Sequence, residues 1–160
     1  MLNITIMTVG KIKEKYFREA IEEYKKRLSR YCRLNIIEVK DEPTPDNPSD
    51  REKEAVLEKE GARIEEKLPK NAYIVALCIE GKMQTSEELA DFLQKTATEG
   101  YSDIAFIIGG SMGLWEEIKK RADLRISFSK MTFPHQLMRV ILLEQIYRGF
   151  NISEGGKYHK

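Results

Sequence analysis

The first part of the chain alternates short apolar segments with a segment of helical periodicity. Residues 2–9 alternate between the two faces of a strand and are rich in β-branched side chains, which predicts a β-strand. From residue 11 onward a charged segment carries an apolar side chain at every fourth position, which predicts a helix with one apolar face. These positions are Tyr16, Ala20, Tyr24 and Leu28. Residues 34–39 then predict a second strand, because the proline-rich loop behind them cannot extend it.

Two capping patterns mark helix starts in the middle of the chain. Ser49 with Glu52, and Thr85 with Glu88, have the spacing at which the two side chains satisfy each other's backbone amides. The helix after Ser49 has few apolar positions, so we expect it to be exposed. Between the two patterns, residues 73–79 form a continuous apolar run of the length of a strand.

The last third repeats the order of strand and helix. The pattern predicts strands over residues 104–108 and 124–128 and a short helix over 115–121. A final helix is predicted from Pro134, a residue suited to a first helical turn, to about residue 148. The whole chain is therefore predicted to be one α/β domain, residues 1–160, with a mostly parallel sheet covered by helices on both faces.

The final helix contains four consecutive apolar residues, so its apolar groups point in all directions. We expect a subunit interface to supply the additional burial, which predicts a homodimer. The residues are Val140, Ile141, Leu142 and Leu143.

Composition narrows the class of protein. No apolar run approaches the roughly 20 residues of a membrane span, and the chain starts with a strand rather than a signal peptide, so we expect a cytoplasmic protein. Cys32 and Cys78 lack a CxxC spacing and are interpreted as reduced core residues, and we expect no metal ion. Net charge is only +1, but residues 1–33 carry nine basic against four acidic side chains and residues 124–160 carry six against two. If the two ends meet, one basic face can follow phosphates; a random surface distribution is the alternative.

The glycine-rich segment 109–113 follows a predicted strand and precedes a helix. Ligands bind at this end of the strands in α/β sheets, and glycines let the backbone approach a ligand closely. A tight turn without a ligand is the other interpretation. The spacing matches neither a dinucleotide fingerprint nor a phosphate-binding loop.

The same segment satisfies G-x-S-x-G, with Ser111 as the nucleophile of a serine hydrolase and Asp123 and His135 as its triad partners. The spacing disfavours this hypothesis, because Asp123 lies only twelve residues after the serine and such enzymes place further strands between the triad members. A histidine at the start of a helix, without a chemical role, is the alternative for His135. For His159, the alternative is a residue of a frayed chain end without a chemical role.

Three longer segments and the end of the chain together indicate a family and decide between these alternatives. Residues 77–87 (LCIEGKMQTSE), 106–114 (FIIGGSMGL) and 127–150 (SFSKMTFPHQLMRVILLEQIYRGF), followed by Tyr158, His159 and Lys160, resemble the ribosomal RNA large-subunit methyltransferase H family. That family consists of pseudouridine-N3 methyltransferases of the SPOUT superfamily. The resemblance spans essentially the whole chain, including its opening strand and the GKIKEKY segment that follows.

The resemblance implies a fold and a cofactor. It implies an α/β fold with a deep C-terminal trefoil knot, which is an exception to the rule that chains do not thread loops. It also implies that S-adenosyl-L-methionine binds within the knot. The matching positions are Leu77, Gly109, Phe128, Ser129, Lys130, Met131, Thr132 and Phe133.

The resemblance further implies a homodimer in which the partner's tail completes each active site. By position, Arg148, Tyr158 and His159 face the RNA, and Lys160 contacts phosphate. The implied reaction is methylation of N3 of a pseudouridine in the 23S ribosomal RNA of the assembled ribosome. We assign His159 as the base or a group that assists it, because a histidine titrates near neutral pH. A ribosome-binding protein without catalysis is the alternative, and binding of S-adenosylmethionine discriminates the two.

Overall fold

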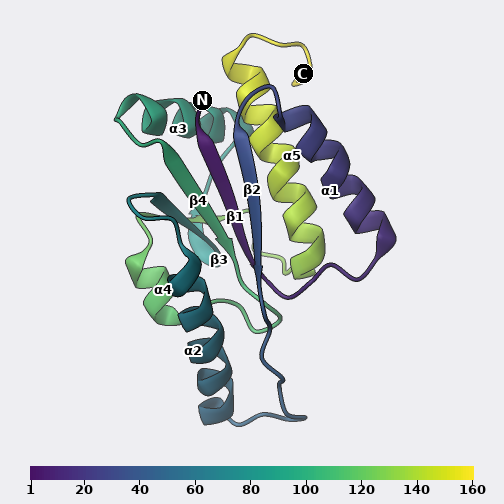
Figure 1. Ribbon diagram of the computed structural model, residues 1–160, viewed down its shortest axis with the longest axis vertical. Helices are drawn as coiled ribbons and strands as arrows, with labels where there is room; N and C mark the ends of the chain where they lie inside the picture. The colour runs from purple at the N-terminus through teal and green to yellow at the C-terminus, as the bar shows by residue number, and fades with distance from the viewer.

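The computed structural model describes all residues, 1–160, as a five-stranded sheet with five helices (Figure 1). In chain order the elements are β1 (Asn3–Val9), α1 (Lys15–Leu28), β2 (Arg33–Val39), α2 (Asp50–Lys67), β3 (Tyr73–Met83), α3 (Ser86–Thr98), β4 (Asp103–Ile108), α4 (Glu116–Arg121), β5 (Leu124–Ser127) and α5 (His135–Ser153). None of the helices combines the length and the apolar character that crossing a bilayer requires.

The sheet is parallel throughout, as the alternation of strands and helices predicted. Its strand order is β2-β1-β4-β3-β5, and every neighbouring pair runs in the same direction. Parallel neighbours need a crossover between them, and the helices supply these crossovers. All carboxyl ends of the strands therefore lie at one edge of the sheet, which is the lower edge in Figure 1.

Helices cover both faces of the sheet, which confirms the predicted layers. Successive side chains of a strand point to opposite faces, so β1 contributes Ile4 and Ile6 to one core and Met7 and Val9 to the other. Helices α1, α3 and α5 pack on the first face, and α2 and α4 pack on the second (Figure 1). The helix after Ser49 was predicted to be exposed, and this is wrong for one of its faces. That face buries Val56, Glu60, Gly61 and Ile64.

The helix boundaries differ from the predicted ones at two places. Helix α1 begins at Lys15 rather than residue 11, because Gly10 has a positive φ of 83° and the chain turns there before the helix starts. The side chain of Tyr16 is 65% exposed, so it does not belong to the apolar face predicted for α1. Helix α5 continues to Ser153, beyond the predicted end near residue 148.

Both predicted capping boxes are present. Ser49 accepts a hydrogen bond from the backbone N–H of Glu52 at 3.1 Å, and Glu52 accepts one from the N–H of Ser49 at 3.1 Å. Thr85 and Glu88 form the same reciprocal pair at the start of α3. Each box satisfies amides that the first turn of a helix leaves without partners, which fixes where α2 and α3 begin.

The two ends of the chain meet in space, as required for one basic face. Helix α1 packs along α5 on the same face of the sheet (Figure 1). Tyr24 of α1 lies 6.4 Å from Tyr147 of α5, measured between ring centroids. The two end segments, each with an excess of basic residues, therefore lie side by side, and a single basic face made by them stays a prediction.

Candidate functional site

A crevice opens where β3 and β4 separate at the carboxyl edge of the sheet. Strand β3 pairs with β4 only from Tyr73 to Ala76. Beyond that point it pairs with β5 alone, and its register shifts between Leu77 and Lys82. On the side of β3, the end of β4 therefore faces an opening, while its other side pairs with β1 as far as Ile108. Parallel sheets bind their ligands at this position.

The crevice has a volume of about 790 Å³, and half of its 22 lining residues are apolar. This size is suitable for a cofactor, since ligand sites range from about 300 to 1,000 Å³. Of the positions predicted to bind the cofactor, the crevice is lined by Leu77, Gly109, Phe128, Ser129, Met131, Thr132 and Phe133. Lys130 is exposed and does not line the crevice, so its place in the site stays a prediction.

The glycine turn after β4 forms one wall of the crevice. Gly109 is buried, and a Cβ atom at this position would collide with the backbone carbonyl of Gly113. Gly113 has a φ of 89°, which side chains other than glycine rarely adopt, and its N–H donates to the carbonyl of Gly110 at 3.0 Å. The turn therefore requires glycine for its own geometry. It also presents backbone rather than side chains to a ligand.

His135 lies at the start of α5 and lines the crevice from the opposite side. It is half-buried, and its Nδ1 atom is buried without a hydrogen-bond partner. Burial, and secondarily the positive charge of Arg139, lower the pKa of His135 below its ordinary value. The imidazole is therefore neutral at neutral pH and offers a polar atom to a ligand.

Arg139 fixes the start of α5 against the edge of the sheet. Its side chain is only 2% exposed, and its Nη1 atom donates to Glu38 Oε2 at 2.7 Å. Its Nη2 atom donates to the backbone carbonyls of Val9 at 2.9 Å and Gly10 at 2.8 Å. A buried guanidinium needs such partners, and these contacts hold the helix that carries His135 next to the carboxyl end of β1.

The geometry contradicts the serine hydrolase hypothesis. Ser111 and His135 both line the crevice at the carboxyl edge. Asp123 lies instead before β5, where its carboxylate accepts a hydrogen bond from the N–H of Ile74 at 2.8 Å and its own N–H donates to the Ile74 carbonyl at 2.8 Å. It thereby joins the amino ends of β3 and β5, across the sheet from the serine, and cannot orient His135 as a triad acid must.

Several crevice residues were not predicted from the sequence. Cys78 and Glu80 lie in the irregular part of β3 and line the crevice. Cys78 was predicted to be a core residue, and this is wrong, because its side chain is only partly buried. Lys119 of α4 forms an ion pair with Glu80, with its Nζ atom 2.5 Å from Oε1, and this contact lowers the pKa of Glu80. No spacing in the sequence connects these residues, because the register shift in β3 brings them together.

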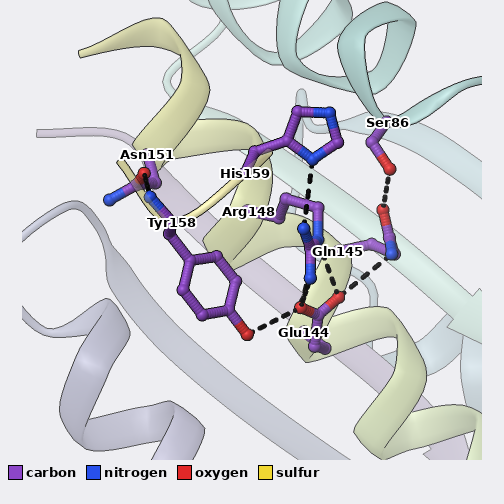
Figure 2. Close-up of polar contacts among 7 residues, drawn as sticks. All are labelled: Ser86, Glu144, Gln145, Arg148, Asn151, Tyr158 and His159. Atoms are coloured by element: carbon purple, nitrogen blue, oxygen red, sulfur yellow. Dashed lines mark hydrogen bonds and ion pairs between the residues drawn. The ribbon is translucent and has the colours of Figure 1, made fainter. Parts of the chain in front are cut away.

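The three predicted catalytic residues lie together at the other end of α5 (Figure 2). The Nη2 atom of Arg148 is 2.6 Å from Oε1 of Glu144, and its Nε atom also donates to this carboxylate at 3.1 Å. The hydroxyl of Tyr158 donates to the same carboxylate at 2.9 Å, and the guanidinium of Arg148 lies 4.7 Å from the centre of the Tyr158 ring. The acidic partner of both residues was missed, although its spacing of four residues before Arg148 is a usual signal of a helical ion pair.

His159 joins this cluster through both ring nitrogens. Its Nδ1 atom lies 3.1 Å from Nη1 of Arg148, and its Nε2 atom lies 2.6 Å from Oε1 of Glu87 in α3. Together with Glu144 and Tyr158 these residues form what we call the tail cluster. Glu87 was also missed, because no local pattern connects the first turn of α3 to the end of the chain.

The C-terminal segment is folded back onto α5. Gly155 has a φ of 71°, and a Cβ atom at Gly156 would collide with the side chain of Asn151. The N–H of Tyr158 donates to Asn151 Oδ1 at 3.2 Å. The glycine pair therefore forms a turn that brings Tyr158 and His159 back to the helix.

The crevice and the tail cluster lie far apart within one chain. His135 and Arg148 are separated by thirteen residues of continuous helix, which corresponds to about 20 Å along the axis. Figure 1 shows the C-terminus at the end of α5 opposite to the carboxyl edge of the sheet. One chain therefore does not bring its own tail to its own crevice.

Comparisons with known proteins agree on one family. A family model described as a predicted SPOUT methyltransferase matches residues 2–159. The chain is 60% identical over 159 residues to the ribosomal RNA large subunit methyltransferase H of Clostridium kluyveri, a match that covers 99% of this chain and all of the relative. It is 56% identical to the protein of the same name from Clostridium novyi, with the same coverage.

Solved structures show the same fold at low sequence identity. A methylase family protein from Haemophilus influenzae superposes with a TM-score of 0.54 at 11% identity, covering 98% of this chain and 70% of that one. One from Neisseria gonorrhoeae has a TM-score of 0.54 at 15% identity, covering 91% of this chain and 82% of that one.

Proposed function

Because the chain belongs to the SPOUT methyltransferase family, we propose that it methylates N3 of a pseudouridine in 23S ribosomal RNA and takes the methyl group from S-adenosyl-L-methionine. The substrate is the assembled ribosome in the cytoplasm. The observation that carries the proposal is the crevice at the carboxyl edge of the sheet, where the family-matching positions of three separate segments lie around one volume.

The residues of the crevice fit S-adenosylmethionine, the methyl donor. Phe128 and Phe133 give apolar surface for an adenine ring, and the glycine turn at Gly109 leaves backbone groups accessible at close range. The unpartnered Nδ1 atom of His135 offers a hydrogen bond to a polar part of the ligand. S-adenosylmethionine supplies, when bound, an electrophilic methyl group on a sulfonium sulfur.

The tail cluster supplies the groups that the substrate needs. The imide N3 of pseudouridine carries a proton at neutral pH, so a base must accept this proton before the nitrogen can attack the methyl group. His159 accepts it, and the guanidinium of Arg148 stabilises the negative charge that develops on the uracil oxygens. Tyr158, whose ring stacks below that guanidinium, contacts the base.

The two regions meet in a homodimer formed through α5. Val140 and Ile141 are only partly covered by their own chain, which leaves apolar surface on this helix for a second copy. The separation of about 20 Å between crevice and tail within one chain also supports an arrangement in which a partner's tail reaches each crevice. The trefoil knot that the family resemblance implies is part of this proposal. It is supported by the passage of the chain from β5, at one edge of the sheet, back to α5, whose Arg139 contacts the carboxyl end of β1.

Transfer of tritium from labelled S-adenosylmethionine tests the proposal. Ribosomes lacking the modification are incubated with the protein, and the RNA is then digested to nucleosides. We expect label in N3-methylpseudouridine from a single position. Binding of the donor without any transfer to ribosomes would contradict the proposed substrate, and absence of donor binding would favour a ribosome-binding protein without catalysis.

A further inference from the structure

The hydrogen bonds of the tail cluster determine which nitrogen of His159 carries a proton. A guanidinium has only donors, so the Nδ1 atom that faces Arg148 at 3.1 Å must accept and carries no hydrogen. A carboxylate has only acceptors, so the Nε2 atom that faces Glu87 at 2.6 Å must donate and carries the hydrogen. The docked imidazole is therefore neutral, with its proton on Nε2 and its electron pair on Nδ1.

This arrangement has the form of a carboxylate and imidazole pair in which the carboxylate orients the base. In such pairs the acid holds one N–H, fixes the tautomer and stabilises the imidazolium that forms when the other nitrogen takes a proton. Here the free electron pair points toward Arg148, the residue that contacts the substrate in the proposed function. While no substrate is present, Arg148 donates a hydrogen bond to this electron pair.

We propose that Glu87 is a positioning residue for the methyl transfer, which orients His159 so that Nδ1 faces the substrate. The inference rests on the proposed function, because it assigns a partner to the base named there. Glu87 belongs to the same chain as the tail it holds, so it would serve the crevice of the neighbouring subunit.

The position of Glu87 is itself fixed by the start of α3. It lies in the first turn, between the capping-box residues Thr85 and Glu88. The backbone N–H of its own residue, and secondarily the hydrogen bond from His159, hold the pKa of this carboxyl below its usual value. A carboxylate that stays ionised at neutral pH can accept the hydrogen bond from the Nε2–H group of the imidazole throughout the reaction.

The proton and electron balance of the step is complete with these groups. The proton of the pseudouridine N3 moves to Nδ1 of His159, which becomes an imidazolium with its second proton on Nε2 against Glu87. The N3 electron pair forms the new N–C bond to the methyl group, and the electron pair of the broken S–C bond stays on sulfur. The imidazolium then loses its proton to solvent, which restores the starting tautomer.

Exchange of Glu87 for glutamine tests the inference, with Asp91→Asn as the matched control. Asp91 is exposed on the same helix, so its exchange removes the same charge without touching the tail. For Glu87→Gln we expect kcat to fall about tenfold or more with little change in KM for ribosomes, since the base is misoriented rather than lost. The double variant Glu87→Gln, His159→Ala should be no slower than His159→Ala alone. Activity of Glu87→Gln equal to that of Asp91→Asn would overturn the inference.

Nitrogen-15 NMR of the imidazole rings measures the tautomer of His159 independently of methyl-transfer activity. The chain has only two histidines, so the His159→Ala spectrum identifies the ring in question. We expect a neutral ring protonated on Nε2 in the unaltered protein and a mixture of tautomers in Glu87→Gln. A ring protonated on Nδ1, or one that Glu87→Gln leaves unchanged, would overturn the inference. Failure of ribosome methylation by the unaltered protein would instead remove the proposed function, and the NMR result would still decide whether Glu87 fixes the tautomer of His159.

Discussion

The crevice and the tail cluster stand at opposite ends of α5 and are built in opposite ways. The crevice lies at the carboxyl end of a parallel sheet, and its lining consists mainly of glycine backbone and uncharged side chains such as Gly109 and Phe128. The tail cluster consists of charged and aromatic side chains, such as Glu144, Arg148 and Tyr158, held to each other by hydrogen bonds at the surface. Packing of the sheet and its loops forms the crevice, whereas hydrogen bonds and ion pairs between charged side chains form the tail cluster.

This difference matches two different tasks. A donor molecule that is the same in every turnover is suited to a site preformed by the sheet, because no ordering is required when it binds. A nucleotide within a ribosome approaches from outside, and only surface groups can reach its polar edges. We therefore expect substitutions in the crevice to change donor affinity and substitutions in the tail cluster to change the rate of transfer.

The largest effect is expected from Gly109→Leu. The side chain would collide with the backbone of Gly113 and displace the turn that lines the crevice, so donor affinity should fall more than about 100-fold, a loss of about 2.7 kcal/mol or more. Isothermal titration calorimetry with S-adenosylmethionine measures this, and circular dichroism checks that the variant is folded. Unchanged affinity in a folded variant would remove the glycine turn from the donor site.

Arg148→Ala should slow methyl transfer about 100-fold without lowering the affinity for S-adenosylmethionine. It removes the cation that stabilises charge on the uracil, and it leaves the carboxylate of Glu144 without its ion pair. Single-turnover methylation at saturating ribosomes gives the rate, and calorimetry gives the donor affinity. A variant that loses donor affinity instead would contradict the separation of the two regions.

Reactivity of the two thiols should report occupation of the crevice. Burial raises the pKa of Cys32 to about 11, and that of Cys78 is raised by the same cause, but only Cys78 lines the crevice. Alkylation followed by mass spectrometry should therefore modify Cys78 before Cys32, and S-adenosylmethionine should slow the reaction of Cys78 about fivefold or more. Equal rates for Cys78 with and without the donor would place the ligand elsewhere.

Tyr158→Phe should have the smallest effect. It removes one hydrogen bond to Glu144 and keeps the ring beneath Arg148, so a loss of about two- to fivefold in rate is expected for a partly exposed contact. Tyr158→Ala, which also removes the ring, should be slower than Tyr158→Phe in the same assay. Equal rates for the two variants would show that the ring does not matter.

The sequence predicted the architecture well because periodicity and caps are local signals. The strands, the two capping boxes and the parallel sheet required only the spacing of apolar residues and of pairs such as Ser49 and Glu52. A predicted helix boundary was wrong where the backbone conformation of one residue determines it, as at Gly10, where a turn delays the start of α1. The burial of one face of α2 also could not be read from its sparse apolar positions.

The site was only partly predictable. The glycine turn and the residues around Phe128 and His159 came from a family resemblance, since short motifs alone left a hydrolase and a plain turn open. Glu80 and Lys119 at the crevice, and Glu87 at the tail, depend on contacts between elements far apart in the chain. Such pairs carry no local pattern, because only the register shift of β3 and the return of the tail onto α3 bring them together.

Mixed dimers test the central claim most directly, namely that one subunit's crevice works with the other subunit's tail. Gly109→Leu and His159→Ala chains with different affinity tags are coexpressed, and the heterodimer is purified through both tags. Each heterodimer then has one intact crevice facing one intact tail across the interface, so about half of the methylation rate of the unaltered dimer is predicted, while each variant homodimer stays inactive. A heterodimer as inactive as the two homodimers would show that crevice and tail act within one chain, and would contradict the account.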